Sequence, residues 1–403
     1  MQETFDQLTA TPVRRFPLSC PALLTFCVAA MLHGQSFPSG STGADGDLIV
    51  STAGVTTFTA TPVGGGNVYN FKTIQIASGA TLRLSGSVFP GPLYFLAQGA
   101  VTVTGTIDLS GQNGVVPTAS GQRTGPTIPG AGGYGGGAGS FGANGPLPGL
   151  GPLGGAVNAV ACGTGLEGGP GGQSATPFLI PLVGGSGGAG GSGNGGAGGG
   201  ALLIASSVSI TVNGTITAAG GSGIGAFPSS SGGGAGGGIR LVAPLIAGVG
   251  TITAAGGAAY YCTNTGAKGT VRLEAYNYTF SGTTAGNVYT ASPVALFLPA
   301  ANTQPSITVT SIGGITVPTN PSGTFTVPDV LLNSTAPLTV NIHAVNVPPG
   351  TIPTLYFSTQ NFPDQTIVPS AGLSGTLASS TTTTTVTLSP GYSIGFVTAT
   401  WVQ

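Results

Sequence analysis

The stretch GGALLIASSVSITVNGTITAAGGSG, residues 199–223, decides how this chain folds. It contains a short apolar strand, a turn, a second strand with G-T-I, and a glycine-rich exit. Apolar and polar residues alternate with period two in S-I-T-V, which is typical of a strand with one buried face. One unit of this kind cannot bury its own apolar face, so it needs neighbours of the same type.

Such neighbours are present, because the motif recurs along the sequence. Further copies begin at Gly91 and Gly237, a degenerate copy begins at Gly269, and a half-copy begins at Phe71. Stacking the copies in parallel buries a continuous core and pairs the backbone groups of adjacent rungs. The repeat therefore predicts an all-β chain whose residues 36–300 form a right-handed parallel β-helix-like solenoid with glycine-rich insertions. The alternative is a set of generic hairpins.

The alternation also assigns side chains to faces. Residues two apart on a strand share a face, and Gly105 is expected to reset the register within its copy. The pattern predicts one interior column of stacked isoleucines: Ile107, Ile216 and Ile252. Two outward columns are expected beside it, one of Thr106, Thr215 and Thr251 and one of Asp108, Thr217 and Thr253.

Residues 111–200 are the largest glycine-rich insertion, with runs such as GGSGGAGGSGNGGAGGG that offer almost no side chains for packing. Glycine loses the most backbone entropy on folding, which favours flexible loops. Glycine also lets backbones approach closely, as extended polyglycine or polyproline II-like strands. Because a structureless insertion of this length is unusual in a compact domain, an ordered layer against the solenoid is the preferred interpretation.

Composition excludes several classes of protein. Glycine accounts for 75 of 403 residues, charged residues for only 4%, and the net charge is −1. A chain with this balance lacks the electrostatic basis for binding nucleic acid or anionic membranes. The hydrophobic content of 40% is sufficient for a folded core, which argues against general disorder.

The N-terminal residues 1–35 are predicted to be a signal peptide. A short basic region, Arg14 and Arg15, precedes the apolar run 18–32, which is too short to span a bilayer. We expect a secreted protein, extracellular or at the cell surface, with no membrane insertion after signal removal. In such a protein Cys162 and Cys262 are a candidate disulfide, and two free buried thiols are the alternative.

Residues 303–403 change in character, with less glycine and more Pro, Val and Thr. Short alternating strands separated by turn signals predict an immunoglobulin-like β-sandwich without the usual cysteine pair. The expected strands are 306–310, 323–327, 338–345, 354–358, 374–378, 384–388 and 396–402. Tyr356 and Trp401 are predicted to be core aromatics.

Residues suited to catalysis or metal binding are few. His343 is the one histidine after the predicted signal, and it lies in an alternating strand pattern that favours a structural or surface role. Asp45 and Asp47 are weak candidates for a Ca²⁺ site, and a polar turn is the preferred alternative. No cofactor is predicted, since the glycine runs match neither a phosphate-binding loop nor a dinucleotide fingerprint.

Arg240 and Arg272 occupy the same position in two copies of the repeat, with Arg83 as a further equivalent, and Glu274 lies close by in sequence. Arg240, Arg272 and Glu274 are therefore a candidate ligand face, such as a groove for carbohydrate. The preferred alternative is a ladder of solvated strand residues. Fold analogy alone cannot supply an activity.

The sequence resembles a class of uncharacterised, secreted, glycine-rich bacterial surface proteins with a C-terminal immunoglobulin-like module. The motifs that carry the resemblance are SGSTGADGDL at Ser39, YNFKTIQIASGATLRLSG at Tyr69, GTIDLSGQNG at Gly105, the paired ALLIAS and IRLVA openings, and TVPTNPSGTFTVPDVLL at Thr316. The resemblance covers nearly all of the mature chain. It implies an extracellular location and a β-helix-like body, and no defined activity.

These observations predict a non-catalytic extracellular structural or adhesive surface protein, whose partner is polysaccharide or other cell-surface material. The second hypothesis is a polysaccharide-binding or polysaccharide-degrading β-helix protein. The third is an ice-binding protein that uses the threonine columns.

Overall fold

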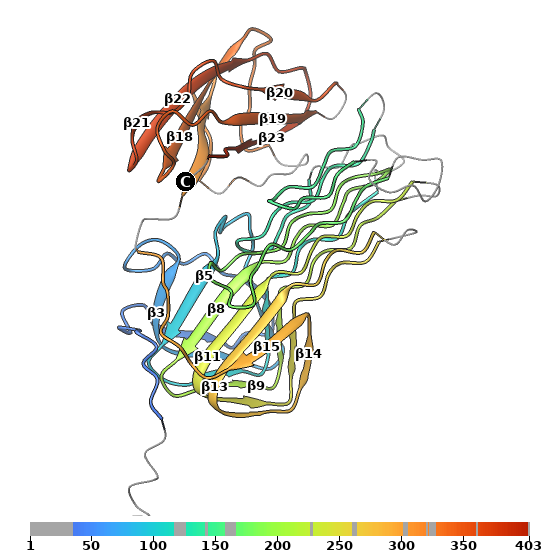
Figure 1. Cartoon of the computed structure of the whole chain (residues 1–403). Helices are drawn as coiled ribbons and strands as arrows, with labels where there is room; N and C mark the ends of the chain where they lie inside the picture. Colours follow the sequence, from blue (N-terminus) through green and yellow to red (C-terminus); the bar gives the residue numbers. More distant parts are fainter. Residues whose placement is uncertain are drawn as a thin grey trace, which may run out of the picture. The chain divides into compact units, whose positions relative to one another are not determined.

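The computed structural model describes residues 35–116, 126–141, 144–157, 167–225, 229–259, 264–300, 305–319, 321, 328–359 and 362–401. Within these ranges every regular element is a strand, so the all-β prediction is confirmed (Figure 1). The described part of the chain contains no helix with the length and apolarity needed to cross a bilayer. Residues 1–34 of the predicted signal peptide and both cysteines of the candidate disulfide lie outside the described residues.

The larger parallel sheet has nine strands, in the order β15-β13-β11-β8-β5-β3-β6-β9, and β1 pairs with β3. The strands are β1 (Gly46–Val50), β3 (Val68–Ile76), β5 (Leu93–Ala97), β6 (Val101–Val103), β8 (Ala201–Ser206), β9 (Ser209–Val212), β11 (Gly238–Gly248), β13 (Thr270–Phe280) and β15 (Asn287–Ala291). Their β-branched and aromatic residues are those that favour strands.

The smaller parallel sheet has six strands, in the order β14-β12-β10-β7-β4-β2. They are β2 (Gly54–Thr57), β4 (Ala80–Arg83), β7 (Thr106–Asp108), β10 (Thr215–Thr217), β12 (Thr251–Thr253) and β14 (Thr283–Ala285). Ile216 is in register with Ile107 on one side and with Ile252 on the other, and all three are fully buried. The predicted isoleucine column is therefore confirmed.

The prediction of a β-helix-like solenoid followed by an immunoglobulin-like sandwich is wrong. Two long strands each pair with two neighbours in succession: β3 with β5 and then β6, and β11 with β8 and then β9. Since β5 also pairs with β8 and β6 with β9, six parallel strands form a closed ring of pairings. The expectation of equivalent rungs failed because copies of one motif form different numbers of strands.

A serine explains part of this difference. The Oγ of Ser206 accepts hydrogen bonds from the backbone N–H groups of Val208 and Ser209, each at 3.0 Å, and this local turn ends β8 before β9 begins. The corresponding segment of β11 continues through Pro244 without interruption. Similar apolar patterns therefore give two short strands in one copy and one long strand in another.

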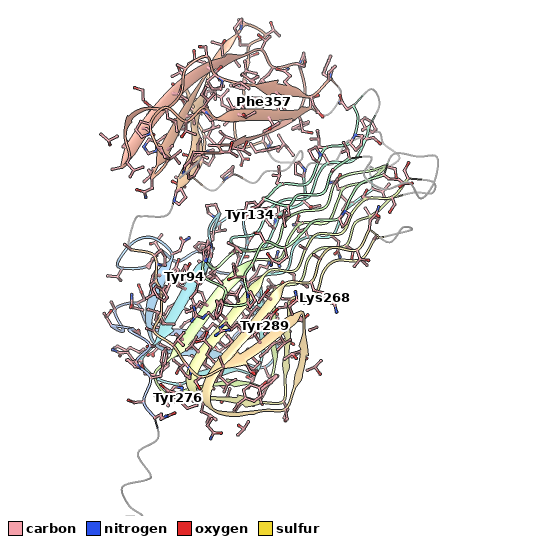
Figure 2. All side chains as sticks on the ribbon, viewed as in Figure 1. Tyr94, Tyr134, Lys268, Tyr276, Tyr289 and Phe357 are labelled. Atoms are coloured by element: carbon pink, nitrogen blue, oxygen red, sulfur yellow. The ribbon has the colours of Figure 1, made fainter. Side chains whose placement is uncertain are left out.

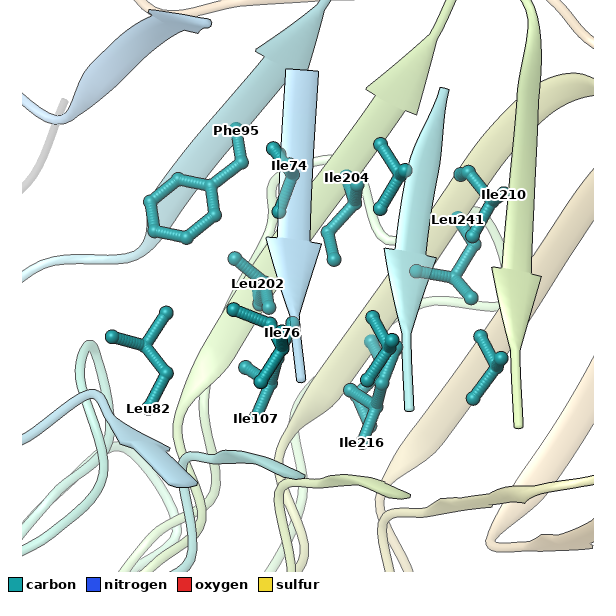
Figure 3. Packing of buried hydrophobic residues seen from close by; sticks show 14 of the residues in the cluster. Ile74, Ile76, Leu82, Phe95, Ile107, Leu202, Ile204, Ile210, Ile216 and Leu241 are labelled. Atoms are coloured by element: carbon teal, nitrogen blue, oxygen red, sulfur yellow. The ribbon is translucent and has the colours of Figure 1, made fainter. Parts of the chain in front are cut away.

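The main hydrophobic core joins residues of both parallel sheets. Figure 3 shows Ile74, Phe95, Ile204 and Leu241 from the larger sheet and Ile216 from the smaller one. At one end the core is aromatic, with Phe58, Tyr69, Phe71, Phe89 and Phe95 at centroid separations from 5.1 to 5.8 Å. Four of the six pairs are edge-to-face, one is tilted and one is stacked. Aromatic pairs in edge-to-face or offset-stacked geometry add about 0.5–1.5 kcal/mol each beyond the burial of their area.

The glycine-rich segments form a bundle of extended chains joined by backbone hydrogen bonds, which we call the glycine bundle. Residues 185–191 show its geometry, because successive N–H groups donate to three different neighbours. Residues 185, 188 and 191 donate to 199, 196 and 193, residues 186 and 189 to 172 and 169, and residues 187 and 190 to 150 and 147. A period of three is that of a polyproline II helix. The expected order is therefore confirmed for the described residues, but the solenoid against which the layer was expected to lie is not present.

Close packing explains why these positions are glycine. A Cβ atom built on Gly187 would lie 2.0 Å from the carbonyl oxygen of Gly135, and one on Gly190 would lie 2.0 Å from that of Ala138. Three glycine-rich segments of this bundle connect strands of the parallel sheets. One lies between β7 and β8, one between β10 and β11, and one between β12 and β13. The glycine-rich segments are therefore part of the folded core rather than insertions into it.

The C-terminal part forms two antiparallel sheets, one ordered β17-β16-β18-β22-β21 and one ordered β20-β19-β23. The strands are β16 (Ser306–Ile312), β17 (Ile315–Thr316), β18 (Leu338–Val345), β19 (Thr354–Thr359), β20 (Gln365–Ile367), β21 (Ser374–Thr376), β22 (Ser379–Val386) and β23 (Ser393–Thr398). Buried Val340, Ile342, Leu355 and Phe357 form a core shared by both sheets.

Most of the strands expected in this part are present, and the predicted immunoglobulin-like arrangement of them is not. The expected strand 323–327 lies outside the described residues. The short strands β17 and β20 were not predicted, and β22 begins at Ser379, before its expected start at residue 384. Two- and three-residue edge strands carry too little alternation to be recognised in a sequence.

Candidate functional site

Three charged side chains meet on the outer face of the larger sheet and form what we call the charged triad: Arg240, Arg272 and Glu274. Arg240 lies on β11 directly opposite Arg272 on β13. Residues two apart on a strand share a face, so Arg272 and Glu274 point to the same side. One carboxylate oxygen of Glu274 accepts from both guanidinium groups, at 2.8 Å from the Nε of Arg240 and 2.6 Å from the Nε of Arg272.

The charged triad is buried. Arg240 is 1% exposed, Arg272 7% and Glu274 0%. The ladder of solvated residues that the sequence favoured is therefore wrong for these positions. The candidate ligand face is also covered, because a buried cluster does not line an open groove.

Two segments distant in sequence cover the charged triad. The backbone N–H of Val294 donates to the second carboxylate oxygen of Glu274 at 3.1 Å. Arg272 donates from Nη1 to the carbonyl of Pro177 at 3.2 Å, and its guanidinium lies 5.2 Å from the ring centre of Phe178. The covering segments belong to a second apolar cluster: Phe37, Tyr94, Leu96, Leu179, Leu182, Ala201, Leu203, Ala205 and Val242, with Leu296 and Leu298 packed against it.

The charges of the triad do not balance, since two guanidinium groups meet one carboxylate. The Nη2 atom of Arg240 is buried without a hydrogen-bond partner in the described structure. An unsatisfied donor of this type costs about 1–3 kcal/mol, more for a charged group. Tyr94 is nearby, but burial raises the pKa of its hydroxyl to about 12, with Arg240 opposing the shift, so it is neutral at ordinary pH. The triad therefore joins β11, β13 and the two covering segments through hydrogen bonds, with two guanidinium groups for one carboxylate.

Arg83 does not belong to the triad, which corrects its alignment with Arg240. It lies on β4, opposite Asp108 on β7, and the Nη1 of Arg83 is 2.8 Å from a carboxylate oxygen of Asp108. Both side chains are partly exposed. Their ion pair therefore contributes about 0–1 kcal/mol to stability.

The weak Ca²⁺ candidates link the start of β1 to β3 and to the segment before it. The two carboxylate oxygens of Asp45 accept from the backbone N–H groups of Val63 and Asn70, at 2.6 and 2.5 Å. Asp47 accepts from the hydroxyl of Thr73 at 2.7 Å. Among the described residues no three His, Cys, Asp or Glu side chains gather in a way that could hold a metal ion. The preferred polar-turn interpretation agrees with the position of Asp45, which lies in a turn, whereas Asp47 lies within β1.

The other residues singled out from the sequence, His343, Tyr356 and Trp401, contact neighbouring residues of the C-terminal part. His343 lies on β18, with its Nε2 3.1 Å from the hydroxyl of Ser379. Tyr356 is partly buried and stacks on Phe396 at a centroid separation of 4.9 Å. Trp401 is partly buried against a small apolar cluster. In the described part of the chain, no hydrogen bond or ring contact joins any of the three to the charged triad.

The outer face of the smaller sheet carries a longer row of threonines than the sequence suggested. Thr81, Thr106, Thr215, Thr251 and Thr283 are in register on five adjacent strands, and we call this row the threonine column. The sequence identified the middle three. The end members stand at the same position in T-L-R of the half-copy and T-T-A of the degenerate copy, where the motif T-I-T is altered.

Comparison of the chain with protein families, with curated proteins and with solved structures finds no match to any of them. The resemblance to secreted glycine-rich bacterial surface proteins therefore stays a prediction.

Proposed function

We propose that this chain is a non-catalytic structural or adhesive protein of the cell surface or the extracellular space. The observation that carries this proposal is the burial of the charged triad, whose residues were the strongest candidates for a binding or catalytic site in the sequence. Its carboxylate is fully used by two guanidinium groups and a backbone N–H, beneath covering segments. A carboxylate held in this way is not available as a general acid or base, which must reach its substrate.

The rest of the described structure supports the same proposal. The glycine bundle is held by backbone hydrogen bonds, and adjacent strands of the parallel sheets pair in regular register. Such an arrangement gives a stiff body with few charges, and the whole chain carries only 4% charged residues. Stiffness favours binding to extended surfaces, because little conformational entropy is lost on contact.

The proposed partner is polysaccharide or other cell-surface material. Tyr276 on β13 and Tyr289 on β15 are each 38% exposed and are labelled in Figure 2. Both strands lie at one end of the larger sheet. Exposed tyrosine offers an apolar ring and a hydroxyl together, which suits contact with sugar rings and their hydroxyl groups.

Sedimentation with insoluble material tests the proposal. The purified protein is mixed with isolated cell-wall material and insoluble polysaccharides, and reducing ends in the supernatant are measured at the same time. We expect co-sedimentation without release of reducing sugar, and weaker co-sedimentation for the double variant Tyr276→Ala, Tyr289→Ala. The control is Tyr392→Ala, which removes a tyrosine of 43% exposure in the C-terminal part. Sustained release of reducing ends would contradict the non-catalytic assignment.

A further inference from the structure

The threonine column forms part of a regular array of hydroxyl and methyl groups. Neighbouring strands lie about 4.7–4.9 Å apart, and residues two apart on a strand are separated by about 6.4–6.8 Å. Thr217 and Thr253 stand two residues after Thr215 and Thr251, in register with each other, and begin a second row. On β10 and β12 the array is therefore two-dimensional, with one threonine at every outward position.

The hydroxyl groups of the two rows are engaged differently. Thr217 accepts from the backbone N–H of Ala219 at 3.3 Å and lies 3.0 Å from the hydroxyl of Ser110, and Thr253 accepts from the N–H of Ala255 at 3.4 Å. These bonds hold the second row in place. Within the described residues, no hydrogen bond engages the hydroxyl groups of the threonine column, which leaves them available to an external partner.

Backbone hydrogen bonds and the buried core hold the array in position. The backbone ladder continues beyond the strands, because Leu109 donates to Thr217, Ala218 donates to Thr253, and Ala254 donates to Ala285, at 2.7, 2.8 and 2.7 Å. Beneath the array Ile107, Ile216 and Ile252 are fully buried, so the strands cannot rotate without exposing them. The array is thus fixed before any partner arrives.

We propose that this array binds ice. Its outward residues on β10 and β12 carry no charge and no aromatic ring, which argues against an ionic ligand and against the stacking that sugar rings prefer. The oxygen atoms of hexagonal ice repeat along one lattice direction with a spacing close to that of adjacent strands. Hydroxyl groups bond to such a lattice, and the methyl groups between them order the first shell of water.

The array has a defined limit. At β4 and β7 the second row consists of Arg83 and Asp108, whose ion pair interrupts the threonines. Contact with ice is therefore centred on β10 and β12, with Thr106 and Thr283 at its sides. This inference does not depend on the adhesive function, because a different face and a different ligand carry each of them.

Two measurements on the purified full chain test it. A single ice crystal is grown slowly in a solution of the protein, and the protein in the melted crystal is compared with that in the liquid. We expect incorporation into the crystal and a measurable gap between melting and freezing temperatures. Exclusion of the wild-type protein from ice, to the extent seen for a protein without ice affinity, would overturn the proposal.

Variants locate the site. The double variant Thr215→Tyr, Thr251→Tyr places bulky rings on the array and is expected to lose both ice incorporation and the freezing gap. The matched control is Thr102→Tyr, Thr211→Tyr, whose positions are also half-exposed and in register, on β6 and β9 of the other sheet. Thermal unfolding of both variants shows whether they fold. Retention of ice incorporation by the folded first variant would place the activity elsewhere and overturn the assignment to this array. If the first variant fails to fold, Thr215→Ser, Thr251→Ser replaces it, and unchanged incorporation and freezing gap in that variant would count against a role for the methyl groups.

Discussion

Arg240 and Arg272 lie directly opposite each other on adjacent parallel strands and share one carboxylate oxygen of Glu274. Two like charges in register are unfavourable alone, and here both are withdrawn from water. Only the carboxylate between them, together with the segments that contribute Pro177 and Val294, makes the pairing tolerable. The arrangement fixes how the chain before β8 and the chain after β15 cover the outer face of the sheet.

Replacing Glu274→Gln is expected to destabilise the protein strongly, because two guanidinium groups remain buried without a counter-charge. Loss of one partner from a buried ion pair costs about 3–5 kcal/mol. The measurement is the free energy of unfolding in urea. Asp108→Asn is the control, since its ion pair with Arg83 is partly exposed and is worth about 0–1 kcal/mol. Equal decreases in the free energy of unfolding of the two variants would show that Glu274 stabilises the fold no more than a partly exposed ion pair does.

A methyl group added inside the glycine bundle is expected to disrupt it. Gly187→Ala places a Cβ 2.0 Å from the carbonyl oxygen of Gly135, so the packed chains must separate. Overpacking of this kind costs about 1–3 kcal/mol, and more when backbone atoms are the obstacle. Gly64→Ala is the control, because nothing lies within 4 Å of its added Cβ. The thermal midpoint should fall for the first variant and stay nearly unchanged for the second; the opposite order would contradict the bundle.

The interior isoleucine column predicts a further difference. Ile216→Ala removes buried atoms between Ile107 and Ile252, and a large-to-small change of this kind costs about 2–5 kcal/mol. Val208→Ala is the control, because Val208 is 53% exposed. Urea unfolding of both variants measures the difference. A loss at Ile216 no greater than that at Val208 would contradict the stacked core.

High pH is expected to weaken the fold through Tyr94. Burial raises the pKa of its hydroxyl from 10.0 to about 12 in the folded protein, so the folded state resists ionisation. Stability from this group is complete below pH 10 and is lost as the pH rises from about 10 to 12. Tyr94→Phe should lose less stability over this range than the wild type, as measured by urea unfolding at several pH values. Parallel pH dependence in the two proteins would show that Tyr94 ionises freely.

The sequence predicted the parts of the fold that depend on local alternation. Ile107, Ile216 and Ile252 occupy the same place in three clear copies, so their register followed directly. Thr81 and Thr283 were missed because their copies alter the surrounding T-I-T motif. The closed ring of pairings was not predictable, because it depends on whether a side chain such as Ser206 ends a strand within an otherwise similar apolar run.

The candidate site shows a second limit of the sequence. The repeat placed Arg240, Arg272 and Glu274 together correctly, yet it predicted them in solvent. Their burial depends on segments around Phe178 and Val294, which have no periodicity and are far from Arg240 along the chain. Burial by segments that are distant in sequence leaves no local pattern from which it could be predicted.

The structural role in the proposed function requires the glycine bundle to be a fixed, hydrogen-bonded body rather than a set of loops. Amide hydrogen exchange of residues 184–200, compared with that of β8 and β11, measures this directly. We predict that the amides of Gly185, Gly188 and Ala189 exchange as slowly as those of the buried strands, because each donates to a neighbouring chain. Exchange at the rate of an unfolded chain, while β8 and β11 stay protected, would contradict the rigid body on which the proposal rests.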